Sequence, residues 1–134
     1  AKYVERTAPH GKIRLAPIDV YLDDTNVVQP DVMWNGADSP CILIDDAYWR
    51  GAPDLVIEVL SPSTALRDKQ AKFRLYEKYG VREYWIVEPT ARYVEVWYLS
   101  DERFALHGVF GIGETFTSAV LGQKLVEVGA IFGA

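Results

Sequence analysis

The sequence predicts an α/β or α+β fold, in which several strands form a sheet and one helix covers a face of that sheet. Residues 53–60, PDLVIEVL, are almost continuously apolar, which is typical of a strand buried on both faces. A helical segment follows at once, from about Thr64 to Tyr79. Two strand-like segments, 83–88 and 92–99, come next and are joined by a short turn. The order of strands, helix and strands favours a sheet with a flanking helix.

Two proline-containing segments precede this unit. Residues 13–22, IRLAPIDVYL, predict a strand that Pro17 interrupts, which indicates an edge or a bulge. Residues 27–34, VVQPDVMW, predict a second short strand with Pro30 near its middle. Residues 35–52 are rich in turn-forming residues around an apolar CILI, and we expect a connecting loop with at most one ordered turn.

The helix has a clear end signal and a plausible start signal. The hydroxyls of residues 61–64, SPST, suit the capping of a helix N-terminus. Gly80 suits its C-terminal end. Residues 103–117 predict a hairpin around Gly111-Ile112-Gly113, and the pattern of residues 119–132 assigns no element type.

The composition is that of a soluble globular protein. The 134 residues suit a single domain spanning 1–134, and 49% apolar with 25% charged residues can bury a real core. Cys41 is the one cysteine, which excludes an internal disulfide and a cysteine zinc cluster and suits a reducing, cytoplasmic setting. No apolar run approaches the roughly 20 residues that cross a bilayer, so we expect no membrane association. The net charge of −5 argues against non-specific nucleic-acid binding, although a local basic patch is compatible with it.

Two acidic residues in strand-like segments, Asp31 and Glu58, are candidate metal ligands. A carboxylate among apolar neighbours is costly unless it is paired or bound to a metal. Alternation places Asp54 on the same face as Glu58 but about 13 Å along the strand, too far to share one ion easily. Asp31 comes beside Glu58 if the two strands pair, and the oxygens then suit Mg²⁺ or Mn²⁺. The alternative remains open that Glu58 pairs with a lysine and Asp31 only ends a strand.

Lysines on the predicted helix are the second candidate feature. At about 100° per residue, Lys69 and Lys72 project into the same arc as the apolar side of the helix, which consists of Ala65, Leu66, Phe73, Tyr76 and Gly80. Either these lysines lie at the margin of the apolar side with their amines in water, or one of them reaches the carboxylate-bearing strand. In the second case the amine would stabilise charge that develops on a reacting phosphate.

Residues 53–89, PDLVIEVLSPSTALRDKQAKFRLYEKYGVREYWIVEP, closely resemble the Uma-type restriction endonuclease family of the PD-(D/E)xK nuclease superfamily. The resemblance extends over about residues 13 to 100 and includes APIDVYLDD and VVQPDVMW, with Asp68, Lys72 and Tyr76 spaced by four. It implies a restriction-endonuclease-like mixed central sheet with flanking helices. It also implies that Asp31 supplies the first acidic ligand and Glu58 the acid of the second motif, with Mg²⁺ or Mn²⁺ as cofactor and DNA as substrate. Related nucleases are often dimers, so we expect a homodimer.

The sequence departs from the superfamily pattern in two ways. The lysine expected two residues after the second acid is Leu60 here, and Lys72 on the following helix would have to replace it. Family members usually carry a longer N-terminal part with helices and a glutamate. Because the chain opens at Ala1 without Met, we expect that this helical part is missing from it.

Three functional hypotheses follow. In the first, the chain is a metal-dependent DNA endonuclease in which Asp31 and Glu58 hold the cation and Lys72 neutralises developing charge. Asp54, Lys69 and Tyr76 are its secondary candidates. In the second, the chain is a catalytically weak nuclease-fold module for binding or regulation, as the acidic net charge and the displaced lysine suggest. In the third, it is a structural dimer subunit whose Trp- and Tyr-rich strands form the interface.

Overall fold

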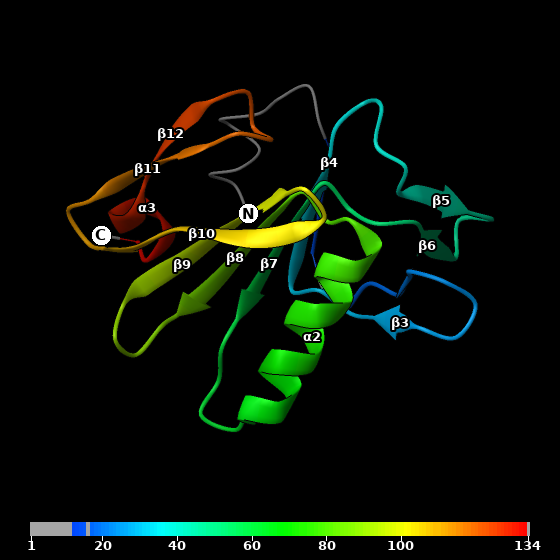
Figure 1. Ribbon diagram of the computed structural model, residues 1–134, viewed down its shortest axis with the longest axis horizontal. Helices are drawn as coiled ribbons and strands as arrows, with labels where there is room; N and C mark the ends of the chain where they lie inside the picture. Colours follow the sequence, from blue (N-terminus) through cyan, green and yellow to red (C-terminus); the bar gives the residue numbers. More distant parts are fainter. Residues whose placement is uncertain (1–11, 16, 134) are drawn as a thin grey trace.

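The main element of the fold is a six-stranded mixed sheet. The computed structural model describes residues 12–15 and 17–133. Figure 1 shows α2 lying across one face of this sheet, and β11, β12 and α3 gathered apart from that helix. The strand order is β1-β4-β7-β8-β9-β10. In that order the strands comprise Lys12–Leu15, Val32–Asn35, Leu55–Val59, Glu83–Glu88, Tyr93–Ser100 and Arg103–Gly111. The pair β7–β8 is parallel and the other pairs are antiparallel, so the predicted α/β fold with a mixed central sheet is confirmed.

Both faces of the large sheet are covered, because side chains alternate along its central strands. Val56 and Tyr84 pack in one cluster with Tyr76 of α2 (Leu66–Tyr79). Leu55 and Trp85 point to the other side. There they pack with apolar residues of the C-terminal elements β11 (Thr115–Ser118), β12 (Lys124–Glu127) and α3 (Val128–Ile131). A strand buried on both faces was the prediction for residues 53–60, and β7 confirms it.

A small second sheet accounts for the two proline-containing segments and corrects their prediction. Its order is β3-β2-β6-β5, and its strands comprise Val27–Val28, Val20–Tyr21, Tyr48–Arg50 and Ile42–Ile44. Each segment predicted as one strand is divided between the two sheets, 13–22 into β1 and β2, and 27–34 into β3 and β4. Proline has no N–H for a sheet ladder, so Pro17 and Pro30 lie between the strands rather than within one.

The prediction of a connecting loop over residues 35–52 was wrong. These residues contain the antiparallel hairpin β5–β6, and β6 also pairs in parallel with β2. Each of the two strands has three residues. Such strands are too short to show the alternation by which a sequence reveals a strand.

The end of α2 was predicted correctly and its start was not. Gly80 adopts the left-handed conformation with φ of 85°, and the Val81 N–H donates to the Tyr76 carbonyl at 3.0 Å. At the other end the N-cap residue is Ala65, and no side chain caps the helix. The Thr64 hydroxyl instead accepts a bond from the Ser61 N–H at 2.9 Å, which closes the turn before the helix.

The predicted apolar side of α2 is only partly correct. Tyr76 is fully buried, whereas Leu66 is 68% exposed. The apolar contacts of the helix with the sheet are made by Phe73, Leu75, Tyr76 and Tyr79, all in its second half. The first turns are thus free of apolar packing and carry polar side chains over the sheet.

The predicted hairpin over residues 103–117 has the expected turn but different partners. The Glu114 N–H donates to the Gly111 carbonyl at 3.0 Å, and Gly113 has φ of 91°. However, β10 pairs with β9, and β11 pairs with β12. The turn redirects the chain to the other face of the large sheet, where burial of Phe116 favours the separate pairing. Among the described residues, no helix is long and apolar enough to span a membrane.

Candidate functional site

The structure brings Asp31 and Glu58 together at the junction of β4 and β7. The two strands are antiparallel with Val32 opposite Ile57, so the next residues along, Asp31 and Glu58, are also opposite each other. The Asp31 N–H donates to Glu58 Oε1 at 3.0 Å, and the Val59 N–H donates to Asp31 Oδ2 at 2.7 Å. Residues opposite each other in an antiparallel pair project to the same face. Both acids therefore belong to the face that α2 covers.

Glu58 is buried and is contacted by two side chains of α2. Its side chain is 6% exposed, and Lys72 Nζ lies 3.1 Å from Glu58 Oε2. The Tyr76 hydroxyl donates to the same oxygen at 3.1 Å. The Lys72 side chain is 46% exposed, so its amine reaches a buried carboxylate from the solvent side. One turn of helix separates Lys72 from Tyr76, and this spacing lets both side chains meet Glu58.

The pKa of the Tyr76 hydroxyl is raised by its surroundings, including both acids. Burial raises its pKa most, and the negative charge of Glu58 and, to a smaller degree, that of Asp31 raise it further. The hydroxyl therefore stays protonated and acts as a hydrogen-bond donor to Glu58. Through this bond Tyr76 orients the Glu58 carboxylate.

The other two candidate residues lie elsewhere. Asp54 precedes β7 at its far end, where it accepts a bond from the Gly36 N–H at 2.9 Å and lies 3.9 Å from Arg82 Nη1. Lys69 Nζ lies 3.7 Å from Glu95 Oε2 of β9 rather than near Glu58. The structure therefore brings together Asp31, Glu58, Lys72 and Tyr76, and it separates Asp54 and Lys69 from them.

Sequence reasoning missed Glu95, the partner of Lys69. In the sheet, Ile86 is the register partner of both Glu58 on β7 and Glu95 on β9, so the three residues form one row beneath α2. A signal was present in the sequence, because Glu95 is the acidic residue of an apolar strand. Its place opposite Lys69 depends on the strand register, which the sequence pattern does not reveal.

The available ligand atoms at this site are two carboxylates. Within residues 12–15 and 17–133 no group of three or more His, Cys, Asp or Glu side chains is arranged to hold a metal. Two carboxylates are nevertheless the usual protein contribution to Mg²⁺, which keeps several waters and is also held by substrate phosphate. The donor set is all oxygen, which matches a hard divalent cation rather than zinc.

A polar hollow of about 350 Å³ lies beside Lys72 and is lined by Ser61, Ser63, Thr64, Asp68, Ala71 and Lys72.

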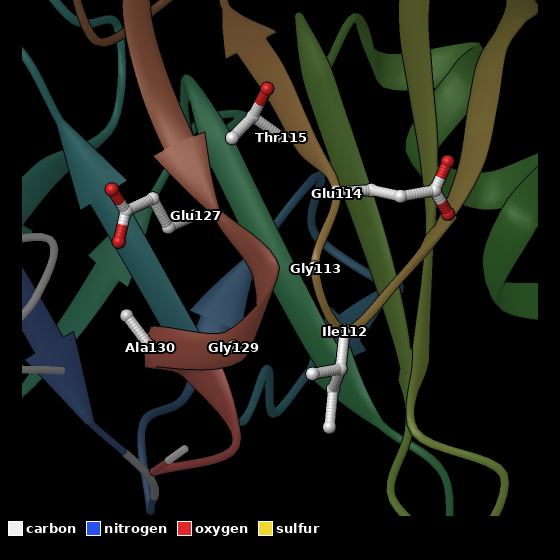
Figure 2. A pocket seen from close by; sticks show the side chains of 7 residues that line it. All are labelled: Ile112, Gly113, Glu114, Thr115, Glu127, Gly129 and Ala130. Atoms are coloured by element: carbon white, nitrogen blue, oxygen red, sulfur yellow. The ribbon is translucent and has the colours of Figure 1, made fainter.

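A second hollow shares no residue with the first. It is formed by residues of the β10–β11 turn and of the β12–α3 segment. Figure 2 shows that the side chains of Glu114 and Glu127 there point away from each other. The acids of that second hollow do not converge on a common point, and it offers no comparable site.

The mixed sheet, the two acids on adjoining strands and the lysine on the following helix together define a restriction-endonuclease-like α/β protein. The family described as "Uma2: Putative restriction endonuclease" matches residues 2–127, and the chain belongs to this family. Among solved structures it is similar to one titled a putative nuclease belonging to DUF820 from Anabaena variabilis, with a TM-score of 0.76 and 15% identity. That match covers 98% of this chain and 75% of the other, and at this identity it shows the fold. No curated protein sequence matches the chain significantly.

Proposed function

We propose that the chain is a metal-dependent endonuclease that hydrolyses phosphodiester bonds of DNA. The observation that carries the proposal is the meeting of Asp31, Glu58 and Lys72, with the lysine amine 3.1 Å from the buried carboxylate. Membership of the Uma2 family and the nuclease title of the structural neighbour support the same reaction class. The cation, the substrate and the roles of these residues are all parts of the proposal.

Asp31 and Glu58 are the residues that would hold Mg²⁺ or Mn²⁺. When bound, such a cation supplies an activated water and positive charge beside the scissile phosphate. Asp31 Oδ1 has no partner among the described residues and is available to a cation. Glu58 Oε2 is bonded by a half-exposed lysine, whose flexible stem lets the amine move aside.

Lys72 and Tyr76 prepare the site for an anionic substrate. The Lys72 amine lies between the buried carboxylate and solvent, so it can turn from Glu58 to a phosphate oxygen and neutralise charge that develops there. Tyr76 is fully buried and keeps the Glu58 carboxylate oriented while the lysine moves. Both residues lie on one rigid helix, which fixes their distance from the acids.

A second candidate function is a nuclease-fold module that binds or regulates without cutting efficiently. Leu60 is the specific observation in its favour, since it occupies the position of the usual superfamily lysine and Lys72 must act from a different direction. In this case the acids would still bind a cation or serve as an ion-pair partner. The expected homodimer stays a prediction, which size-exclusion chromatography with light scattering would test.

The first experiment measures cation binding through thermal stability. Mn²⁺ or Mg²⁺ titrated into the protein should raise the melting temperature in a saturable way, because a ligand of the folded state stabilises it. Glu58→Gln should abolish this rise. Glu102→Gln, in the exposed turn between β9 and β10, is the matched control and should keep it. A rise that is identical in wild type and Glu58→Gln would place the cation elsewhere.

The second experiment measures cleavage. Supercoiled plasmid incubated with the protein and Mn²⁺ should be converted to nicked or linear DNA. Glu58→Gln should lower the rate by about a thousandfold or more, equivalent to roughly 4 kcal/mol of transition-state stabilisation. Cation binding without cleavage at any metal concentration would favour the non-cutting module.

A further inference from the structure

A hollow on the far flank of α2 from Lys72 combines an apolar floor with a cationic rim. It measures about 340 Å³. Its apolar lining residues, here called the floor, are Leu66, Phe73 and Ile86, and its polar lining residues, here called the rim, are Lys69, Gln70, Arg74 and Glu95. We propose that this hollow binds one nucleotide of a DNA strand, with the base over the apolar floor and the phosphate against Lys69 and Arg74. The proposal rests on the proposed function, since it adds a nucleotide-binding site to the same helix.

The hollow is close to the candidate metal site but separate from it. Its floor residue Ile86 is the direct strand neighbour of Glu58, and adjacent strands are about 4.8 Å apart. At about 100° per residue, the positions of Gln70 and Phe73 project from one flank of α2, and those of Asp68 and Ala71 from the other. A DNA strand held at Glu58 and Lys72 would therefore reach the hollow by passing the exposed first turn of the helix.

The charge of α2 favours a phosphate ligand. Of the fourteen basic residues of the chain, five lie on this helix, which carries only two acidic residues. Its net charge of +3 contrasts with −5 for the whole chain. On the rim, Lys69 is paired with Glu95 at 3.7 Å, whereas exposed Arg74 makes no ion pair with any described residue. Arg74 is therefore available for a charge-assisted bond to phosphate.

The floor and the amide favour a nucleobase over a free anion. Leu66 of the floor is 68% exposed, so an apolar ring in the hollow would remove exposed apolar surface from water. The Gln70 amide both donates and accepts, as the edge of a base requires. Inorganic phosphate could accept a bond from this amide, but it has no apolar ring to pack on the floor.

Trp97 provides a built-in reporter for the hollow. Its indole N–H donates to Glu95 Oε1 at 2.8 Å, and its ring packs edge-on against Phe73 with centroids 4.7 Å apart. Both contacts are to residues that line the hollow. A ligand there changes the environment of the Trp97 indole N–H, which is one of four indole signals in a nitrogen–proton correlation spectrum.

The test is an NMR titration of the metal-free protein with deoxynucleoside 5′-monophosphates and, separately, with inorganic phosphate. Trp97→Phe identifies the reporter signal. We expect this signal to shift in a saturable way with at least one nucleotide and to respond far less to phosphate. Arg74→Ala and Gln70→Ala should each weaken nucleotide binding by about tenfold. Arg67→Ala removes the same charge from α2 outside the hollow and should leave the affinity unchanged.

Three results would overturn the proposal: no nucleotide shifts the Trp97 signal, phosphate alone gives the same shift, or the Arg74 and Gln70 variants bind nucleotide as wild type does. The same spectra of Glu58→Gln separate this proposal from the function itself. If wild type binds nucleotide in the NMR titration but binds no cation in the thermal titration, only the proposed nuclease site is contradicted. Cation binding that depends on Glu58 without any nucleotide binding would contradict only the hollow.

Discussion

The large sheet contains two buried glutamates on adjacent strands, and they differ in the face to which they point and in the partners of their carboxylates. Glu58 on β7 is 4% exposed and faces α2, whereas Glu83 on β8 is fully buried and faces the C-terminal elements. Glu58 is contacted by a lysine amine, a tyrosine hydroxyl and one backbone N–H. Glu83 accepts bonds from four neutral donors: Trp85 Nε1 at 2.6 Å, Ser118 Oγ at 2.7 Å, Ala119 N at 3.0 Å and Val120 N at 3.3 Å.

The difference shows that burial of a carboxylate does not by itself mark a functional site. Three of the donors to Glu83 belong to residues 118–120, which cannot move away without undocking the chain from the sheet. Glu83 therefore acts as a structural link between β8 and the end of β11. The charged partner of Glu58 is a half-exposed lysine that can leave without disturbing the core. This difference is the reason for proposing Glu58, and not Glu83, as a cation ligand.

The largest effect is expected from Glu83→Ala. This change leaves four donors without their acceptor, two of them buried and two partly buried. Hydrogen bonds to a charged group contribute about 1.5–3 kcal/mol each. The free energy of unfolding should fall by at least about 3 kcal/mol in urea denaturation at neutral pH. Glu102→Ala is the exposed control and should change it by less than about 0.5 kcal/mol. A loss below about 1 kcal/mol for Glu83→Ala would end its assignment as a structural link.

Lys72→Met tests the proposed functional role of the Glu58 site, on the face of the sheet that α2 covers. Plasmid cleavage under single-turnover conditions should slow by about a hundredfold, or roughly 2.7 kcal/mol, because the amine no longer neutralises charge on the phosphate. The unfolding free energy should fall by about 1–2 kcal/mol, less than for Glu83→Ala, because the buried Glu58 carboxylate keeps the Tyr76 hydroxyl and the Asp31 N–H as donors. Lys72→Arg should recover part of the rate. A strongly destabilised Lys72→Met with an unaltered rate would make the lysine a structural partner of Glu58 instead.

A smaller effect is expected from Tyr76→Phe. The ring stays buried and one hydrogen bond to Glu58 is lost, so the unfolding free energy should fall by about 1 kcal/mol. Cation binding should persist, measured by the rise in melting temperature with Mn²⁺. Complete loss of cation binding in this variant would show that the hydroxyl contributes more than orientation of the carboxylate.

The smallest effect concerns pH and Glu83. Burial raises the pKa of this carboxyl, against the opposing bonds from Ser118 and Trp85. The folded state therefore binds the proton more tightly than the unfolded state. The stabilising contribution is full below the ordinary pKa of about 4.5 and is lost as pH rises through the folded value. Glutamine does not titrate, so the cost of Glu83→Gln in urea denaturation should be greater at pH 4 than at pH 7. If the cost of Glu83→Gln instead increases towards neutral pH, the pKa of Glu83 is lowered in the folded state rather than raised.

Those contacts of the candidate site that join consecutive elements of the chain could be predicted from the sequence. Those that depend on which residues pair across neighbouring strands could not. Glu58 and Lys72 lie on consecutive elements, and a helix that packs back on its preceding strand brings the second element close to the first. The sequence left open whether Glu58 has a lysine partner or a metal-binding role, and the structure shows the lysine contact. The full burial of Glu83 had no sequence signal, because three of its four donors lie more than thirty residues away in the chain.

The sequence by itself determined the central unit of the protein, β7, α2, β8 and β9. Each of these elements carries its own signal, whether a continuous apolar run, an alternation of buried and exposed positions or a glycine stop at Gly80, and these signals act over a few residues. Only the tertiary structure decided that the segments 13–22 and 27–34, interrupted by Pro17 and Pro30, are each divided between two sheets. It likewise decided that residues 42–50 form a hairpin. It also decided the row of Glu58, Ile86 and Glu95. Such pairings are stabilised by contacts between distant residues, and a local pattern contains no information about which strands will become neighbours.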